Sequence, residues 1–206
     1  MHHLSQRMAA QADLDEDQRE IIEYSLIWIG NTLLGFAGFV LVGLAFGTLT
    51  ATLAAGTSAA FLRAMSGGAH YSAPLRCATM TIITMGLLGQ AGHSLASSPS
   101  STLLLHICGG ALLLVGTPLM WRLAPVAHVN RPISDTERQK FKRLATILFF
   151  LLGCIVVGFP LAVNHELRWG ILLGSTWQLL TLTALGERIV RTFDRVPIFT
   201  GRRTIQ

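Results

Sequence analysis

YSLIWIGNTLLGFAGFVLVGLAFGTLTATLAAGTSAAFL, residues Tyr24–Leu62, is a run of 39 residues without an Asp, Glu, Lys or Arg. A helix crosses the roughly 30 Å hydrocarbon layer of a membrane with about 20 apolar residues. At a rise of about 1.5 Å per residue, this run is about twice too long for one crossing, so it predicts two helices and a turn. A helix of a soluble protein shows a polar face, which whole windows of this run lack.

Three further charge-free runs extend this pattern. Cys77–Trp121 is again long enough for two helices, whereas Leu144–His165 and Trp169–Gly186 fit one helix each. Of the 206 residues, 51% are hydrophobic and 13% are charged, about half the charged share of a typical soluble domain. The sequence therefore predicts an all-α, polytopic membrane protein rather than a soluble protein with buried helices. Six transmembrane helices are expected, near residues 26–46, 49–65, 78–95, 102–121, 144–163 and 168–186.

The rest of the chain flanks or interrupts a single transmembrane domain, residues 26–186. Residues 1–25 combine acids with an apolar stripe, which predicts an amphipathic helix at the interface leading into the first span. They lack the basic region and cleavage site of a secretory signal. A cluster of Gly, Ser and Pro predicts a turn at 89–101, and residues 187–206 form a basic tail.

The distribution of Lys and Arg predicts the orientation. Basic residues gather in segments 63–76 and 122–143 and in the tail, whereas each remaining connection holds at most one. Cytoplasmic loops carry the positive excess, so both termini and these two segments are expected in the cytoplasm, with the chain in the plasma membrane. The net charge of +5 then reflects topology and contact with anionic membrane lipids, and it does not indicate nucleic-acid binding.

One polar segment interrupts the apolar pattern with groups that can do chemistry: RAMSGGAHYSAPLRC, residues 63–77. An ordinary thiol is mostly protonated at neutral pH, and a nearby imidazole can accept its proton. On a straight helix His70 and Cys77 would lie about 10.5 Å apart along the axis, too far for a hydrogen bond. Gly67, Gly68 and Pro74 break the helix, so a loop can fold His70 back onto Cys77.

The start of the third span bears on the same thiol. If this span begins at Cys77 or Ala78, the thiol sits at a helix N-terminus, where the dipole favours the thiolate. Backbone amides near Gly67 and Gly68 can serve as donors to an oxyanion. A structural interpretation stays open, in which the glycines form a turn, the arginines contact headgroups and Cys77 packs as a small apolar side chain.

This segment resembles the active-site region of the accessory gene regulator B (AgrB) family, the membrane cysteine endopeptidases that process quorum-sensing peptide precursors. Members typically show an Arg, then Gly-Gly-Tyr-His-Ala, then a Cys seven residues after the His, where the chain enters a hydrophobic helix. The matching positions are Arg63, Gly67, Gly68, His70 and Cys77.

A second match follows the fourth hydrophobic segment, where the family carries a Pro-containing stretch that ends in Lys-Pro-Ile. Here the stretch is APVAHVNRPI, residues 124–133. The chain length, the six apolar segments and the order of motifs also agree, so the resemblance covers most of the chain. The sequence departs from the family at Ala69, where a Tyr is usual, at Pro74 inside the His–Cys interval, and before Arg131, where many members have an acid.

The resemblance implies a function. Cys77, with His70 as its base, would cleave the C-terminal part from a small AgrD-like precursor peptide through a thioester. The bound peptide would then cyclise to a thiolactone or lactone autoinducing peptide. Supporting or substrate-binding roles fall to Arg63, Gly67, Gly68 and Arg76, and the reaction requires no metal or other cofactor.

Several questions stay open at the level of sequence. A small peptide transporter or exporter is one alternative, although charge-free spans weigh against it, and a non-enzymatic membrane scaffold is another. No close metal-ligand spacing occurs, and three cysteines give no disulfide framework. The third catalytic group is unassigned, since nothing in the sequence places Asp194 beside His70. A monomer and a homodimer both remain open.

Overall fold

The computed structural model describes residues 16–69, 71–126, 134–158 and 164–194. Within these ranges the chain is helical and has no strand, which confirms the all-α prediction. The helices are α2 (Glu16–Ala45), α3 (Leu49–Ser66), α4 (Pro74–Ala96), α5 (Ser101–Ala111), the π-helical segment η1 (Leu112–Gly116), α6 (Thr117–Leu123), α7 (Asp135–Val157), α8 (His165–Thr181) and α9 (Ala184–Asp194).

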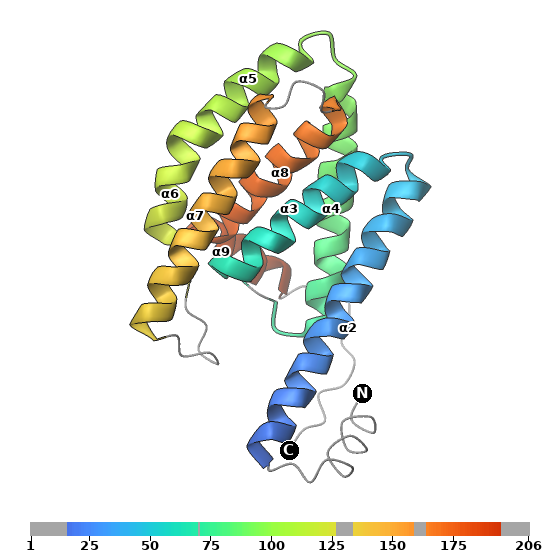
Figure 1. The fold of residues 1–206 in the computed structure, drawn as a ribbon. Coiled ribbons are helices and arrows are strands. Elements are labelled where there is room, and N and C mark those ends of the chain that lie inside the picture. Colours follow the sequence, from blue (N-terminus) through green and yellow to red (C-terminus); the bar gives the residue numbers. More distant parts are fainter. Residues whose placement is uncertain (1–15, 70, 127–133, 159–163, 195–206) are drawn as a thin grey trace.

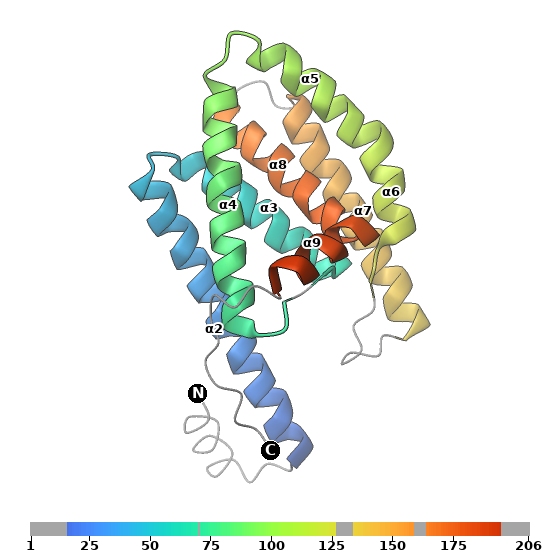
Figure 2. The same cartoon turned by 180° about the vertical axis from the view of Figure 1, so that it is seen from behind.

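Helices α3 and α8 form the centre of the bundle (Figure 1). Helices α2 and α4 pack on one side of this pair, and α7 packs on the other, with α5, η1 and α6 as one continuous helix outside it. The view from behind shows α9 lying across the bundle near the end of α8, transverse to the long helices (Figure 2).

The contact between α3 and α8 is made by small residues. A Cβ atom added to Gly170 would lie 2.4 Å from the carbonyl oxygen of Ala51. A Cβ atom added to Gly174 would lie 2.3 Å from the carbonyl oxygen of Ala55. The two backbones are therefore in van der Waals contact, as small residues permit between helices of membrane bundles.

The first turn of α8 is tied to the neighbouring helices by side chains. The Arg168 side chain is buried, and its Nε donates a hydrogen bond to the Val156 carbonyl oxygen at 2.9 Å. The buried Trp169 indole donates from Nε1 to Ser101 Oγ at 2.9 Å. These bonds connect α8 to α7 and α5. The first turn of α8 is therefore held by side-chain hydrogen bonds, and the rest of the helix is held by its close contact with α3.

Outside the polar segment 63–77, helix boundaries differ from the sequence prediction in the following places. Helix α4 continues to Ala96, so the turn expected at 89–101 is confined to residues 97–100. Helix α7 begins at Asp135, inside the expected connection 122–143, because Ser134 and Glu137 form a reciprocal capping box. Helix α8 ends at Thr181 rather than near 186, and α9 occupies the start of the expected tail.

The expected amphipathic N-terminal segment is described only in part. Residues 1–15 lie outside the described residues. From Glu16 onward the chain is helical and passes without a break into the predicted first span, within α2.

Large apolar side chains cover much of the outside of the bundle. Leu114 is 80% exposed, Phe46 69% and Leu87 68%, whereas Ser175 and Gln178 are buried inside. An apolar exterior of this extent is unusual for a soluble protein. By length and apolar composition, one helix among the described residues is sufficient to cross a membrane, residues 101–123. These features are consistent with membrane localisation, and the count of six spans stays a prediction.

The close contact between α3 and α8 predicts a large effect of one methyl group. In the variant Gly174→Ala, the new Cβ meets the Ala55 backbone, so the helices must move apart. We expect the free energy of unfolding to fall by about 1–3 kcal/mol. Thermal unfolding of the purified protein measures this.

The matched control is Gly110→Ala on α5, where an added Cβ would have no atom within 4 Å. Alanine is the better helix former, so this variant should unfold at the wild-type temperature or slightly above it. Equal unfolding temperatures for both variants would contradict the close α3–α8 contact.

Candidate functional site

The polar segment begins where α3 ends. The N–H of Gly67 donates to the Arg63 carbonyl oxygen at 2.9 Å and so closes the last turn of the helix. Gly67 and Gly68 then adopt φ angles of +68° and +133°, which L side chains rarely adopt. The Gly-Gly pair thus turns the chain sharply out of α3, as the sequence predicts.

The end of α8 holds this turn in place. The buried Gln178 amide donates from Nε2 to the Gly67 carbonyl oxygen at 2.7 Å and to Ser66 Oγ at 3.0 Å. The Ala69 N–H donates to the Thr181 carbonyl oxygen at 3.1 Å. Sequence reasoning missed these partners because they lie more than a hundred residues away, although Gln178 stands out as an amide in an apolar run.

The two family motifs meet at the same place. The Val126 N–H donates to the Ser66 carbonyl oxygen at 2.9 Å. A Cβ atom on Gly67 would lie 2.7 Å from the Val126 carbonyl oxygen. The start of the 124–133 stretch therefore packs directly against the Gly-Gly turn, while Arg131, Pro132 and Ile133 lie outside the described residues.

Cys77 lies in the first turn of α4, which begins three residues earlier than expected. Pro74 occupies the first helical position, where its missing N–H costs nothing. The Cys77 N–H already donates within the helix, to the Ala73 carbonyl oxygen at 2.9 Å. The expectation of a span starting at Cys77 is therefore wrong, although the thiol remains close to the positive end of the helix.

A small cleft opens beside Cys77. Its other lining residues include Arg63 from α3, Ala69 and Tyr71 from the loop, Trp177 from α8 and Val190 from α9. The cavity volume is about 10 Å³, which is close to the smallest space that holds one water molecule. Arg63 and Cys77, 14 positions apart in the sequence, are thus brought to one cleft.

The cleft places a cation and a phenol near the thiol. The Arg63 guanidinium donates from Nη2 to the Ala69 carbonyl oxygen, which ties the side chain to the loop. Burial raises the pKa of the Tyr71 phenol above its ordinary value; a Cys77 thiolate adds to the rise and Arg63 opposes it. Tyr71 therefore keeps its proton at neutral pH, and Arg63 places a guanidinium in the cleft that Cys77 lines.

The far end of the loop contacts α9. Asp194 Oδ1 accepts hydrogen bonds from the Ser72 N–H at 3.2 Å and from Ser72 Oγ at 3.1 Å. It also pairs with Arg76 Nη1 at 3.2 Å. Asp194 and Glu187 are the acids in the basic sequence that follows the apolar run of α8, and the sequence alone does not place Asp194 beside the polar segment.

Most of the predicted site residues come together. The Gly67–Gly68 turn adjoins the cleft that Arg63 and Cys77 line. Arg76 precedes Cys77 and forms its ion pair with Asp194. His70 lies outside the described residues, while Ala69 and Tyr71 on either side of it line the cleft. No group of three metal-ligating side chains was found among the described residues.

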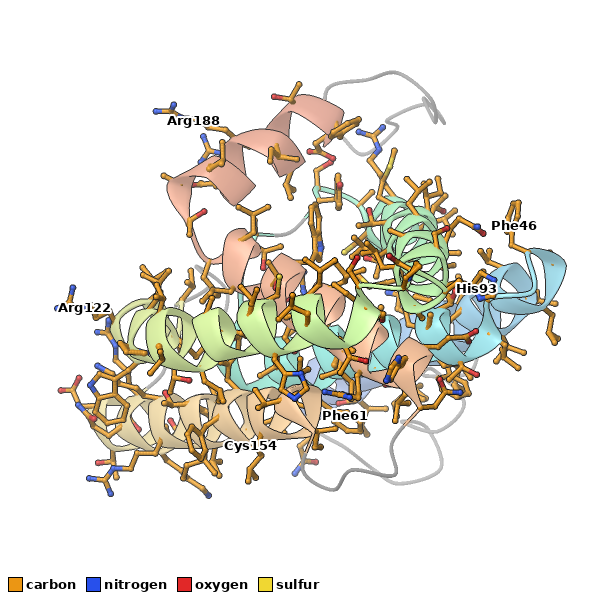
Figure 3. The ribbon with its side chains drawn as sticks, turned by 90° about the horizontal axis from the view of Figure 1, so that it is seen from above. Phe46, Phe61, His93, Arg122, Cys154 and Arg188 are labelled. Carbon is orange, nitrogen blue, oxygen red and sulfur yellow. The ribbon has the colours of Figure 1, made fainter. Side chains whose placement is uncertain are left out.

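The other two cysteines lie elsewhere. Cys108 is in α5 and packs against the hydrophobic core, and Cys154 is in α7. Seen from above, Cys154 lies on the side of the bundle opposite α9, from which Arg188 points outward (Figure 3).

Comparison with known proteins gives the family. The family model described as accessory gene regulator B matches residues 1–182. An AgrB-like protein from Clostridium perfringens SM101 is 24% identical over 93% of this chain and 93% of its own. Another AgrB-like protein, from Halalkalibacterium halodurans, is 24% identical over 85% of this chain and 81% of its own. No solved structure matches. Because the family model spans nearly the whole chain, the chain belongs to the accessory gene regulator B family.

Proposed function

We propose that this chain is a membrane-embedded cysteine endopeptidase that cleaves and cyclises a small, AgrD-like signal-peptide precursor. Membership of the family suggests a role in accessory gene regulator peptide processing. The observation that carries the finer assignment is the shared cleft of Arg63, Cys77 and the loop around position 70. The second family motif adds weight because Val126 packs against the same loop.

The first step forms a thioester. His70 accepts the Cys77 thiol proton, and Sγ attacks the scissile carbonyl carbon of the precursor. The tetrahedral intermediate collapses as the C–N bond breaks, and His70 returns the proton to the leaving amine. The C-terminal piece departs, and the N-terminal piece remains attached to Cys77.

The second step closes the ring. A thiol or hydroxyl within the bound peptide gives its proton to His70 and attacks the thioester carbonyl. The C–S bond to Cys77 breaks, the Cys77 sulfur takes the proton back from His70, and a thiolactone or lactone leaves. The thioester conserves acyl-transfer potential, so this step needs no ATP. Water would hydrolyse the same thioester, so exclusion of water by the bound peptide favours cyclisation.

The remaining site residues have supporting roles. The Arg63 guanidinium stabilises the Cys77 thiolate and holds the loop through the Ala69 carbonyl oxygen. Gly67 and Gly68 allow the turn and a close approach of the peptide backbone. Arg76, next to the nucleophile, fixes the loop through Asp194 or binds a precursor carboxylate.

The proposed function includes a membrane arrangement of the helices. Six crossings, in α2, α3, α4, α5–α6, α7 and α8, leave both termini and the Arg63–Cys77 loop in the cytoplasm, where a newly made precursor arrives. Exposed apolar side chains on α2, α5 and α7 support contact with lipid tails. Basic residues near the cytoplasmic helix ends, Lys142 and Arg143 among them, suit anionic headgroups.

The catalytic roles predict selective losses. Cys77→Ala should abolish truncated and cyclised product, and His70→Ala should lower the rate roughly 100- to 10,000-fold, the contribution of a general base. The measurement is mass spectrometry of peptides from cells that coexpress the chain with a candidate precursor: a short adjacent gene product with an amphipathic N-terminus, an internal Cys or Ser and an acidic tail.

Cys108→Ala and Cys154→Ala are matched controls, because both thiols lie away from the cleft and should leave product levels unchanged. Wild-type product levels from Cys77→Ala would rule out the proposed nucleophile. Loss of product in all three variants would instead point to a general need for the cysteines in folding.

The topology makes a separate prediction about Ser100, which precedes α5, and Gln139, which lies in the first part of α7 beyond the proposed α5–α6 crossing. In a chain with its three native cysteines replaced by Ala, Ser100→Cys should react with a membrane-impermeant maleimide in intact cells. Gln139→Cys should react only after lysis, since it belongs to the cytoplasmic segment. Labelling of both positions from the same side would contradict a crossing between them.

A further inference from the structure

Asp194, the last residue of α9, binds the loop between the proposed base and nucleophile at two points. Its carboxylate accepts hydrogen bonds from the backbone and side chain of Ser72, at 3.2 and 3.1 Å. It also pairs with Arg76 Nη1 at 3.2 Å, and the Asp194 carbonyl oxygen accepts a further bond from Arg76. Ser72 follows position 70 by two residues, and Arg76 immediately precedes Cys77.

These contacts hold a charge pair that is largely shielded from water. The side chains of Arg76 and Asp194 are 15% and 24% exposed. In another pair on α9, Arg191 and Glu187 are 72% and 53% exposed. Exposed pairs contribute little, whereas a shielded pair with additional hydrogen bonds fixes geometry more firmly.

The carboxylate is ionised under all physiological conditions. Partial burial opposes the charged form, but the hydrogen bonds from Ser72 and the Arg76 guanidinium outweigh it and lower the pKa of the Asp194 carboxyl. The charged or titratable side chains that line the cleft are Arg63 from α3, Tyr71 from the loop and Cys77 from α4, and Arg63 donates to the Ala69 carbonyl oxygen. Asp194 is thus the acid that the described structure places at this loop.

Helix α9 provides the support for Asp194. Its buried residues are Gly186 and Val190, and Val190 also lines the cleft of Cys77. Gly186 packs against α8, where an added Cβ would lie 2.1 Å from the Leu180 carbonyl oxygen. The near side of the loop is held by Gln178 and Thr181, and the far side is held by Asp194.

We propose that Asp194 is a positioning residue, which acts through Ser72 and Arg76 to set the geometry of the segment that joins position 70 to Cys77. This role rests on the proposed function of His70 and Cys77. Asp194 lies beyond residues 1–182, the part of the chain that the family model matches. Through this contact, α9 supports the proposed catalytic site.

The test needs no precursor. The rate of Cys77 alkylation by iodoacetamide in the full-length protein is followed between pH 5 and 9 by mass spectrometry of the Cys77 peptide. At pH 7, Asp194→Asn should slow alkylation roughly tenfold or more. A tenfold change in rate corresponds to about 1.4 kcal/mol, close to the free energy that one hydrogen bond to a charged group contributes. Its pH profile should coincide with that of His70→Ala, and Asp194→Glu should recover part of the rate.

The double variant separates positioning from general stability. If Asp194 acts through the His70–Cys77 geometry, His70→Ala/Asp194→Asn reacts no more slowly than His70→Ala alone. The matched control Glu187→Gln, on the same helix but in an exposed pair, keeps the wild-type rate and profile. Additive losses with a lowered unfolding temperature would overturn the positioning role and leave Asp194 a structural residue.

Failures of the two proposals are distinguishable. A wild-type alkylation profile in His70→Ala would overturn the proposed function itself. A slow His70→Ala variant together with wild-type behaviour of Asp194→Asn would overturn only the role of Asp194.

Discussion

The direct contact between the backbones of α3 and α8 is the constraint on which the rest of the site depends. Because Gly170 and Gly174 carry no side chain, the backbone of α8 packs directly against the backbone of α3 at Ala51 and Ala55. The hydrogen bond of Arg168 fixes the start of α8 along the bundle, so the position of the C-terminal end of α8 is determined as well. Gln178 and Thr181 therefore arrive where α3 ends, and they bind the chain as it turns at Gly67.

The proposed chemistry depends on the groups that this arrangement brings to Cys77. After the Gly-Gly turn the loop is bonded to the end of α8 through Ala69, and Ala69 and Tyr71 line the same cleft as Cys77 in the first turn of α4. Arg63 reaches the same cleft from α3, and its positive charge adds to that of the helix N-terminus. In the proposed function, this thiol is the nucleophile, and its thioester with the peptide must be protected from water.

The sequence alone predicts the elements better than their partners. Charge-free runs locate the long helices, since burial of apolar surface depends on local composition, and the glycines of the polar segment announce a turn. Capping moves α7 and α4 upstream of their apolar runs, at Ser134 and Pro74, where helix-starting chemistry competes with hydropathy. The contacts of Gln178 and Asp194 were beyond prediction, because they join residues more than a hundred positions apart and depend on how closely α3 and α8 approach.

The most direct test of the central claim is the mass of the protein during turnover. A precursor whose cyclising Cys or Ser is replaced by Ala cannot displace the thioester within the peptide, so the acyl form should accumulate. Cys77 as nucleophile predicts a mass increase equal to the N-terminal part of the precursor, released by hydroxylamine and mapped to the peptide that contains Cys77. Cleavage of the precursor without such an adduct, or an adduct on Cys108 or Cys154, would contradict it.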